Sequence, residues 1–224
     1  MLPSGPILII GTSLEAERVI HLLRQLPEPP TILGLLRADP NGEPIGSPVC
    51  ELPVLDTLEN LEGYRERIVG AIPAEEGVDL RESIIAALHR AEVPALPVVH
   101  PNACLGPNVV LGPGAVVHSN ATLDAGTRVG RGAIIGMGTT IGAGTRIGDS
   151  AVLEQSCAVG SRVRIGERAR LALGARVVDD VLIGPDAGVG PGSLVVQDIA
   201  AATAVFGNPA SPVARARHPE VDHA

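Results

Sequence analysis

The sequence predicts two structural units in series, a small α/β domain followed by a parallel β-helix, and three observations support this fold class. The first 98 residues alternate apolar runs with helical patterns, whereas residues 99–199 carry a strict six-residue repeat. Hydrophobic residues make up 45% of the chain but aromatic residues only 1%, so the core must consist of small and branched aliphatic side chains in a regular array. Residues 200–224 follow as a closing segment and tail, of which residues 218–224 are expected to be disordered.

The first 98 residues show a Rossmann-like βαβ pattern. A buried strand is expected at residues 7–10, followed by a turn at Gly11 and a helix, and two further strands are expected at residues 31–36 and 68–72. An amphipathic helix is expected at residues 80–91. Strands and helices that alternate in this order indicate a small parallel sheet.

The turn between the first strand and the first helix is a candidate binding site. Phosphates often bind where a strand and a glycine lead into a helix N-terminus, so Gly11, Thr12 and Ser13 are candidate acceptor-binding residues. However, Gly11 stands alone, without the G-x-G-x-x-G fingerprint of dinucleotide-binding proteins. Glu15 and Glu17 in the first helical turn suit the helix dipole but would repel an anion. A plain structural turn is therefore the alternative interpretation.

The second unit is defined by its repeat. Every sixth residue from Val99 to Val195 is aliphatic, over seventeen positions without a slip of register. The residues two places before these positions are small, and ten of the seventeen are followed directly by glycine. A period of six suits a triangular coil of three short strands and eighteen residues per turn, with the aliphatic residue inward and the small residue near a corner. Glycine would permit positive φ angles at the corners, where a Cβ atom is unfavourable.

Burial of the repeated aliphatic residues would stabilise such a coil. Each fully buried Val, Leu or Ile contributes about 1.5–3 kcal/mol, which allows a core without aromatic rings. Some outward positions are also small or apolar, as at Ile134, Ala158 and Leu182, and these need cover from another surface. The sequence therefore predicts a homotrimer.

The distribution of charge and cysteine argues against several classes of function. Residues 1–98 carry 15 acidic and 7 basic side chains and the remainder carries 10 of each, so there is no basic stripe for nucleic acid. The cysteines Cys50, Cys104 and Cys157 are too few and too scattered for a disulfide framework or a zinc site. No metal is therefore expected, and the cytoplasm is the expected location. A signal peptide or membrane span is not recognisable, and no membrane partner is expected.

With these features in place, the chain resembles the bacterial sugar O- and N-acetyltransferases of the sialic-acid O-acetyltransferase (NeuD/PglD-like) family, within the hexapeptide-repeat acyltransferase superfamily. The resemblance covers nearly the whole chain. It rests on the strand–Gly–helix opening, on the six-residue repeats, and on the segments Pro53–Leu61, Val99–Ala103 and Gly207–Ala210.

The resemblance implies a left-handed winding of the β-helix, a homotrimer, and acetyl-CoA bound in the groove between neighbouring helices. It also implies that the α/β domain binds a sugar or nucleotide-sugar. The residues assigned to acetyl-CoA are Arg164, Arg170, Gly174, Gly207 and Asn208. Arginine suits phosphate binding, although ion pairs with Glu167, Asp179 and Asp180 are the alternative for the arginines of this region, which are Arg162, Arg164, Arg168, Arg170 and Arg176.

Two motifs depart from the family pattern. The family opens with a Gly-x-Gly-Gly-His type turn, which here reads Gly-Thr-Ser-Leu-Glu from Gly11 to Glu15. The family's general base is a histidine in a Val-Glu-His-Asp-Cys type hexad, which falls on Gln155 by local similarity and on Ser161 when whole turns are aligned. The second alignment is preferred because insertions of eighteen residues keep every side chain on its face, and it places a second family histidine at Arg170.

Other polar residues are candidates for the missing base. The positions directly after the inward aliphatic residues are mostly glycine, so His118 and Glu154 are exceptions, in one column of the coil and about 10 Å apart. The candidate catalytic residues are therefore His118, Glu154 and Ser161, and the alternative for His118 is a surface or interface residue. His100 at the helix entrance is expected to be structural, and Cys157 occupies a small inward position.

The predicted function is acetyl transfer from acetyl-CoA to an amine or hydroxyl of a sugar or nucleotide-sugar. The alternative is a catalytically inactive trimeric relative that serves as a scaffold or binding subunit, because the family's histidine is absent. A zinc carbonic anhydrase of the β-helix type would need three imidazoles from adjacent turns, and only His100 and His118 lie in the repeats.

Overall fold

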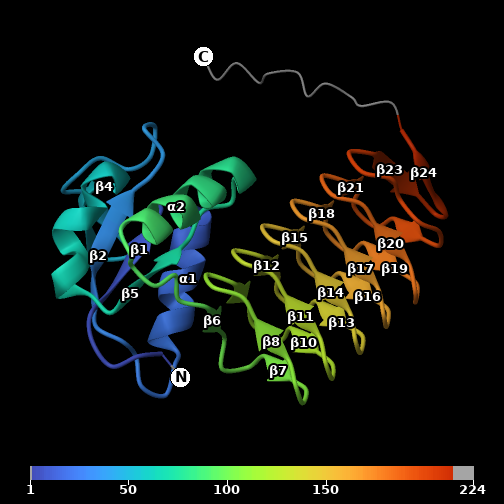
Figure 1. Cartoon of the computed structure of the whole chain (residues 1–224), viewed down its shortest axis with the longest axis horizontal. Coiled ribbons are helices and arrows are strands. Elements are labelled where there is room, and N and C mark those ends of the chain that lie inside the picture. Colours follow the sequence, from blue (N-terminus) through green and yellow to red (C-terminus); the bar gives the residue numbers. More distant parts are fainter. Residues whose placement is uncertain (1, 214–224) are drawn as a thin grey trace.

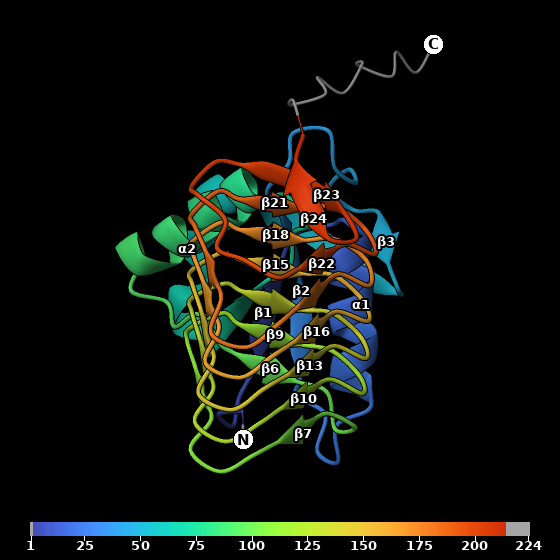
Figure 2. The ribbon, with the colours of Figure 1, turned by 90° about the vertical axis from the view of Figure 1, so that its right-hand side faces the viewer.

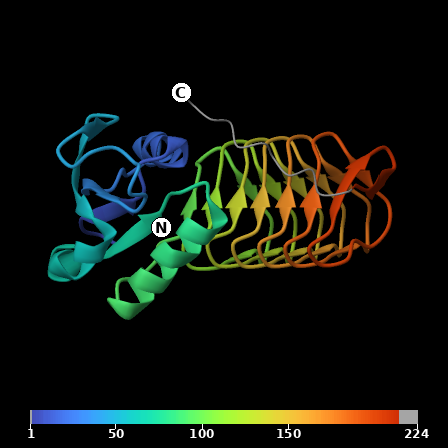
Figure 3. The same cartoon turned by 90° about the horizontal axis from the view of Figure 1, so that it is seen from above.

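The α/β domain and the β-helix lie side by side, with the domain beside the early turns of the helix (Figure 1, Figure 3). This computed structural model describes residues 2–213, so the end of the tail, including the stretch expected to be disordered, lies outside the described residues. Within the described part, the longest helix has 13 residues, and none is long and apolar enough to cross a membrane.

The α/β domain contains each of the elements expected from the βαβ pattern. They are β1 (Ile7–Ile10), α1 (Leu14–Arg24), β2 (Ile32–Arg37), β5 (Gly70–Pro73) and α2 (Val78–Arg90). Strand β1 lies inside the sheet, where it pairs in parallel with β2 on one side and with β5 on the other. All four of its residues are fully buried, because α1 and α2 contribute the apolar layers on the two faces of the sheet.

The edge of this sheet was not expected from the sequence. It consists of β4 (Leu52–Thr57), parallel to β2, and β3 (Pro48–Val49), antiparallel to β4. A 3₁₀-helix, η1 (Leu58–Arg67), leads from β4 back towards β5. Pro48 is the first residue of β3 and Pro53 is the second residue of β4, and these prolines hide the apolar alternation of a strand. Proline is tolerated at the start of a strand and at a sheet edge.

The second unit is a stack of two-residue strands, one for each repeat, that form three parallel sheets (Figure 2). This arrangement fits the left-handed β-helix implied by the family resemblance. The first face consists of β6 (Val98–Val99), β9 (Val116–Val117), β12 (Ile134–Ile135), β15 (Val152–Leu153), β18 (Arg170–Leu171) and β21 (Gly188–Val189). The second face consists of β7 (Cys104–Leu105), β10 (Thr122–Leu123), β13 (Thr140–Ile141), β16 (Ala158–Val159), β19 (Arg176–Val177) and β22 (Leu194–Val195). The third face consists of β8 (Val110–Leu111), β11 (Arg128–Val129), β14 (Arg146–Ile147), β17 (Arg164–Ile165) and β20 (Leu182–Ile183).

The last turn ends in a hairpin on the first face. Strand β23 (Ala204–Gly207) adds to β21 in parallel, and β24 (Ala210–Pro212) folds back antiparallel to β23.

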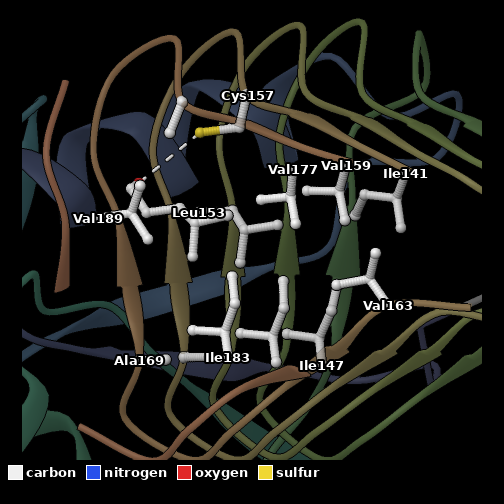
Figure 4. Close-up of a cluster of buried hydrophobic side chains, with 14 of the residues drawn as sticks. Ile141, Ile147, Leu153, Cys157, Val159, Val163, Ala169, Val177, Ile183 and Val189 are labelled. Carbon is white, nitrogen blue, oxygen red and sulfur yellow. Dashed lines mark hydrogen bonds between the residues drawn. The ribbon is translucent and has the colours of Figure 1, made fainter. Parts of the chain in front are cut away.

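The inward aliphatic residues form the predicted core, in columns along the helix (Figure 4). The small residues two places before them are buried with them, including Cys157. Only the first turn is less covered, since Leu105 is 39% exposed and Leu111 is partly exposed. No earlier turn of the helix packs against these two residues.

The expected role of the repeated glycines was wrong. The glycines that follow the inward aliphatic residues do not have positive φ; a Cβ atom placed on Gly136 would instead lie 2.6 Å from the carbonyl carbon of Glu154 in the next turn. These positions need glycine because stacked backbones approach closely. Positive φ occurs two residues later. These positions are occupied by asparagine, serine, arginine or aspartate in some repeats and by glycine in others, as at Asn120 with φ 56° and Gly126 with φ 71°.

The first face of the β-helix is covered by the chain's own α/β domain. The outward side chains of Val98, Val116, Ile134 and Val152 are buried in one cluster with residues of β1 and α1. The expectation that Ile134 needs cover from another copy is therefore corrected, because the domain supplies that cover. Leu182 on the third face is 47% exposed.

A buried arginine fixes the domain to the helix. Arg81 of α2 is fully buried and donates to the carbonyl oxygens of Gly132 (2.7 Å) and Ser150 (3.0 Å) in the β-helix. It also donates to those of Glu75 (2.7 Å) and Glu76 (3.1 Å) in its own domain. Burial lowers the pKa of Arg81 to about 10, so its guanidinium stays charged at neutral pH.

Candidate active site

A cavity of about 230 Å³ lies where the N-terminus of α1 meets the first face of the β-helix. The α/β domain contributes Glu15, Arg18 and Glu76 to its lining. The β-helix contributes Gly136, Met137 and Gln155, the apolar residues Ile134, Val152 and Leu153, and the polar residues His118, Glu154 and Arg170. Two of the three candidate catalytic residues and one candidate cofactor-binding residue therefore line the same cavity.

His118 forms a buried pair with Glu15. The ring nitrogen Nε2 lies 2.8 Å from Glu15 Oε1, and the two side chains are 7% and 2% exposed. His118 directly follows β9, whereas Glu15 lies in the first turn of α1, where the positive end of the helix dipole favours a carboxylate. The contact joins the two units of the chain across 103 residues of sequence.

The second ring nitrogen of His118 is not engaged by the described part of the protein. Among the described residues Nδ1 has no hydrogen-bond partner, yet no buried side-chain nitrogen or oxygen in that part of the chain lacks one. The Nδ1 atom therefore keeps solvent contact, and the cavity is the space that His118 lines. An imidazole held by a carboxylate at one nitrogen and free at the other is suited to proton transfer.

Arg18 completes this arrangement on the domain side. Its Nη1 lies 3.4 Å from Glu15 Oε2 and 2.9 Å from Glu76 Oε1. Glu15 thus contacts His118 with one oxygen and Arg18 with the other. The contact of Glu15 with His118 was not expected from the sequence, where Glu15 was considered only for the helix dipole and for repulsion of an anion. The available signal was its position in the opening turn, where the family has a histidine.

Glu154 is paired within the β-helix. Its Oε1 accepts a hydrogen bond from Arg170 Nε (2.8 Å) and its Oε2 accepts one from the backbone N–H of Leu173 (2.9 Å). Glu154 and His118 thus line one cavity but have different partners. Gly174 lies close by, since its N–H donates to the carbonyl oxygen of Gln155 at 2.9 Å.

The other candidate residues lie elsewhere in the chain. Ser161 follows a strand of the second face, does not line the cavity, and donates its backbone N–H to Asp179 Oδ1 at 2.9 Å. Arg164 is exposed on the third face, so it and Arg170 point away from different sides of the coil. Gly207 and Asn208 lie in the closing hairpin, where the N–H of Gly207 donates to Ser193 Oγ at 3.1 Å.

Two further arginines form ion pairs, and those of Arg162 are among the pairs expected from the sequence, whereas Arg168 has other partners. Arg162 contacts Asp180 through Nε and Nη2, both at 2.7 Å. Arg168 contacts Asp186 at 2.8 Å and also reaches Glu82 of α2 at 2.6 Å. Arg168 therefore supports the contact between domain and helix.

The glycine turn at the start of α1 is in contact with a buried side chain of the protein. The backbone N–H of Thr12 donates to Glu75 Oε1 (3.0 Å), and Ser13 Oγ donates to the carbonyl oxygen of Ala74 (3.3 Å). Glu75 is 4% exposed, and burial raises the pKa of its carboxyl group. An internal carboxylate thus accepts from one backbone N–H of the turn in which the sequence pattern suggested a bound anion.

His100 and Cys157 take structural positions. His100 is buried, its Nδ1 accepts the backbone N–H of Asn102 at 3.1 Å, and burial lowers its pKa. Burial raises the pKa of the Cys157 thiol to about 11, which leaves it unreactive at neutral pH. Over residues 2–213, no cluster of three or more His, Cys, Asp or Glu side chains is placed to hold a metal ion.

Comparison with known proteins gives relatives by structure. The sequence matches no protein-family model and none of the curated proteins. The fold is similar to perosamine N-acetyltransferase from Caulobacter crescentus, crystallised with CoA and GDP-perosamine as a variant with one histidine replaced by asparagine. The two share 31% identity over 96% of this chain and 99% of that chain, with a TM-score of 0.87.

Two other solved structures are also similar. The acetyltransferase domain of PglB from Neisseria gonorrhoeae FA1090 is 25% identical over 93% of this chain and 99% of that chain, with a TM-score of 0.84. WeeI from Acinetobacter baumannii AYE is 21% identical over 94% and 100% of the two chains, with a TM-score of 0.81, and it shares the fold.

Proposed function

Because this chain belongs to the hexapeptide-repeat family of sugar N-acetyltransferases, we propose that it transfers an acetyl group from acetyl-CoA to an amine or hydroxyl of a sugar or nucleotide-sugar. His118 acts as the general base in this proposal and Glu15 positions it. The observation that carries the proposal is the buried pair of His118 and Glu15 in the lining of the cavity.

The chemistry requires one proton to move twice. The acceptor nitrogen or oxygen attacks the thioester carbonyl and loses its proton to Nδ1 of His118. The tetrahedral intermediate then collapses, the carbon–sulfur bond breaks, and the leaving thiolate of CoA takes the proton from the imidazolium. Glu15 keeps the neutral ring protonated at Nε2 and stabilises the imidazolium that forms between the two steps.

The position of the base differs from the pattern of the family resemblance. Neither Gln155 nor Ser161 can accept a proton at neutral pH. In this chain the opening turn provides a carboxylate at Glu15, and the first face of the β-helix provides the imidazole at His118. A paired imidazole at a cavity favours catalysis over the alternative of an inactive scaffold, because a scaffold has no need of an open ring nitrogen beside a carboxylate.

Acetyl-CoA is proposed to lie along the later turns of the first face, beyond the cover of the α/β domain. Arg170 lines the cavity there and Gly174 lies next to it, while Gly207 and Asn208 follow in the closing hairpin on the same face. A guanidinium at this place can stabilise the developing oxyanion or a phosphate of CoA. Arg164 points from another face, so it would reach acetyl-CoA from a neighbouring copy in the expected homotrimer.

The proposal is tested with His118→Ala and the matched control His100→Gln, a histidine of the same column outside the cavity. Acetyl-CoA is incubated with a panel of amino sugars and their nucleoside-diphosphate forms, and acetylated product is measured by mass spectrometry. His118→Ala should lower kcat about 10²–10⁴-fold without weakening acetyl-CoA binding in calorimetry, and His100→Gln should keep the activity. Full activity of His118→Ala would contradict the proposal.

A further inference from the structure

We propose that Arg170 is a second catalytic residue of the cavity: its guanidinium donates to the thioester oxygen of acetyl-CoA as that oxygen becomes an oxyanion, and Glu154 is the positioning residue that holds the guanidinium in place. This inference rests on the proposed acetyltransferase function and assigns the electrophilic half of the same site.

The ion pair of Arg170 and Glu154 is held at several points. Arg170 Nε donates to Glu154 Oε1 at 2.8 Å, and Nη2 donates to the same oxygen. The other carboxylate oxygen, Oε2, accepts the backbone N–H of Leu173 at 2.9 Å. Both oxygens of Glu154 are thus engaged, whereas Nη1 of Arg170 has no hydrogen-bond partner within residues 2–213. A guanidinium of fixed orientation with one free nitrogen is a preorganised donor.

This pair differs from three other ion pairs between turns of the β-helix. Those three join side chains eighteen residues apart, at the same place in successive repeats, and they are Arg131–Asp149, Arg162–Asp180 and Arg168–Asp186. Glu154 lies sixteen residues before Arg170, directly after β15, at a place in the repeat where glycine is frequent. The contact therefore draws the guanidinium back by one turn toward the cavity, and away from the later turns along which acetyl-CoA is proposed to lie.

The space for the reacting groups lies between this pair and the base. His118, Gly136 and Glu154 occupy one column on three successive turns of the first face. Gly136 lines the cavity without a side chain and leaves room between the two polar residues. Two turns span about 10 Å. This gap accommodates three contacts of about 3 Å each: from the base to the attacking atom, from that atom to the carbonyl carbon, and from the carbonyl oxygen to a donor.

The guanidinium stabilises charge and transfers no proton. When the acceptor nitrogen or oxygen attacks, the π electron pair of the thioester carbonyl moves onto the oxygen, and Nη1 of Arg170 donates to this oxyanion. The same electron pair re-forms the carbonyl bond as the carbon–sulfur bond breaks, and the leaving thiolate takes its proton from the imidazolium of His118. Arg170 stays charged throughout, because a guanidinium does not lose its proton near neutral pH.

Steady-state kinetics separate an oxyanion donor from a contact to a phosphate of CoA. Arg170→Ala is compared with the wild type and with Arg128→Ala, which removes an exposed arginine from the third face. Arg170→Ala should lower kcat about 10²–10³-fold with little change in the KM for acetyl-CoA, and Arg128→Ala should keep both values. Thermal denaturation shows whether each variant is folded.

The outcomes distinguish this inference from the proposed function. An unchanged kcat of Arg170→Ala, or a loss confined to the KM for acetyl-CoA, would overturn the inference and leave the proposed function intact. A wild type that acetylates no sugar of the panel would overturn both.

Chemical rescue tests the positioning by Glu154. Arg170→Ala leaves the carboxylate of Glu154 without its guanidinium, so added methylguanidinium should bind there and raise kcat at least about tenfold. The double variant Arg170→Ala/Glu154→Gln keeps the shape of the side chain but not its charge, and it should not be rescued. Methylguanidinium should also leave the kcat of His118→Ala unchanged, because that variant keeps its own guanidinium. An absent rescue of Arg170→Ala, or an equal rescue of the double variant, would contradict the role of Glu154.

Discussion

The first and third faces of the β-helix are built from the same repeat but differ in the residue that comes directly after each strand. On the third face this residue is glycine after all five strands. On the first face the same positions include His118, Glu154 and Ala172, and only two of the six after β6 to β21 are glycine. The third face therefore keeps the residue that tight stacking of turns requires, whereas the first face has at two of these positions, His118 and Glu154, side chains that line a cavity.

The outward positions of the two faces differ as well. Val116, Ile134 and Val152 on the first face are buried by the α/β domain. Arg128 and Arg146 occupy the corresponding positions on the third face and are exposed. The repeat thus decides which side chains point inward, whereas the character of an outward position depends on the surface that covers it.

The largest expected effect on stability is the difference between substitutions of an inward and an outward residue on the same strand. Ile147→Asp buries an unpaired carboxylate in the core. The free-energy cost of burying this charge exceeds the free energy of unfolding of a typical protein, so no folded protein is expected. Arg146→Asp, its neighbour on the exposed side, lies between Arg128 and Arg164 in adjacent strands and should change the free energy of unfolding by less than about 1 kcal/mol. Circular dichroism and urea unfolding measure both. A folded Ile147→Asp protein would refute the assigned register.

The next effect compares apolar outward residues on the two faces. Ile134→Ala removes a side chain buried between helix and domain and should lower the free energy of unfolding by about 2–4 kcal/mol. Leu182→Ala, on the third face, should cost less than about 1 kcal/mol in the dissociated chain. Chemical denaturation over a range of protein concentrations distinguishes the effect of Leu182→Ala on the folding of the single chain from its effect on assembly of the expected homotrimer. If Ile134→Ala and Leu182→Ala lowered the free energy of unfolding equally at low protein concentration, the proposed difference between the two faces would be wrong.

A smaller effect concerns the glycine column of the third face. A Cβ atom on Gly148 would lie 2.5 Å from the backbone nitrogen of Glu167, so Gly148→Ala should destabilise the protein by about 1–3 kcal/mol. Ala172→Gly, at the same place in the repeat on the first face, should cost about 0.5–1 kcal/mol through added backbone freedom in the unfolded chain. Thermal denaturation of the two variants gives the comparison, and a Gly148→Ala protein as stable as the wild type would contradict the close stacking.

The smallest effect concerns the reactivity of the cysteines, which reports their burial without a change in the stability of the protein. At pH 8 the exposed Cys104 should react with Ellman's reagent in the native protein, whereas Cys157 should not, because burial raises its pKa to about 11. Mass spectrometry after alkylation identifies the labelled cysteine. Rapid labelling of Cys157 before unfolding would show that the core is open.

Much of the fold could be predicted from the sequence because the repeat specifies it locally. The inward register followed from residue type at every sixth position, and the structure confirms it from Val117 to Val195. The place of positive φ was wrong, since a glycine that is needed for close approach looks the same in sequence as one needed for its backbone angle.

The candidate site could be predicted only in part. His118 and Glu154 could be singled out as exceptions to glycine within the repeat. Glu15, Arg18 and Arg81 could not, because their contacts depend on how the domain packs on the first face, and no local pattern encodes that packing. Glu75 was missed for the same reason, since its partner Thr12 lies 63 residues away.

The central claim is that His118 and Glu15 act as one unit, and a double-mutant cycle on kcat tests it most directly. His118→Ala, Glu15→Gln and the double variant are compared at saturating acetyl-CoA with the best acceptor of the panel. The account predicts that each single change lowers kcat, and that the double variant is no slower than His118→Ala, because Glu15 works through the imidazole. Losses that simply multiply, or an unaffected Glu15→Gln, would contradict the account.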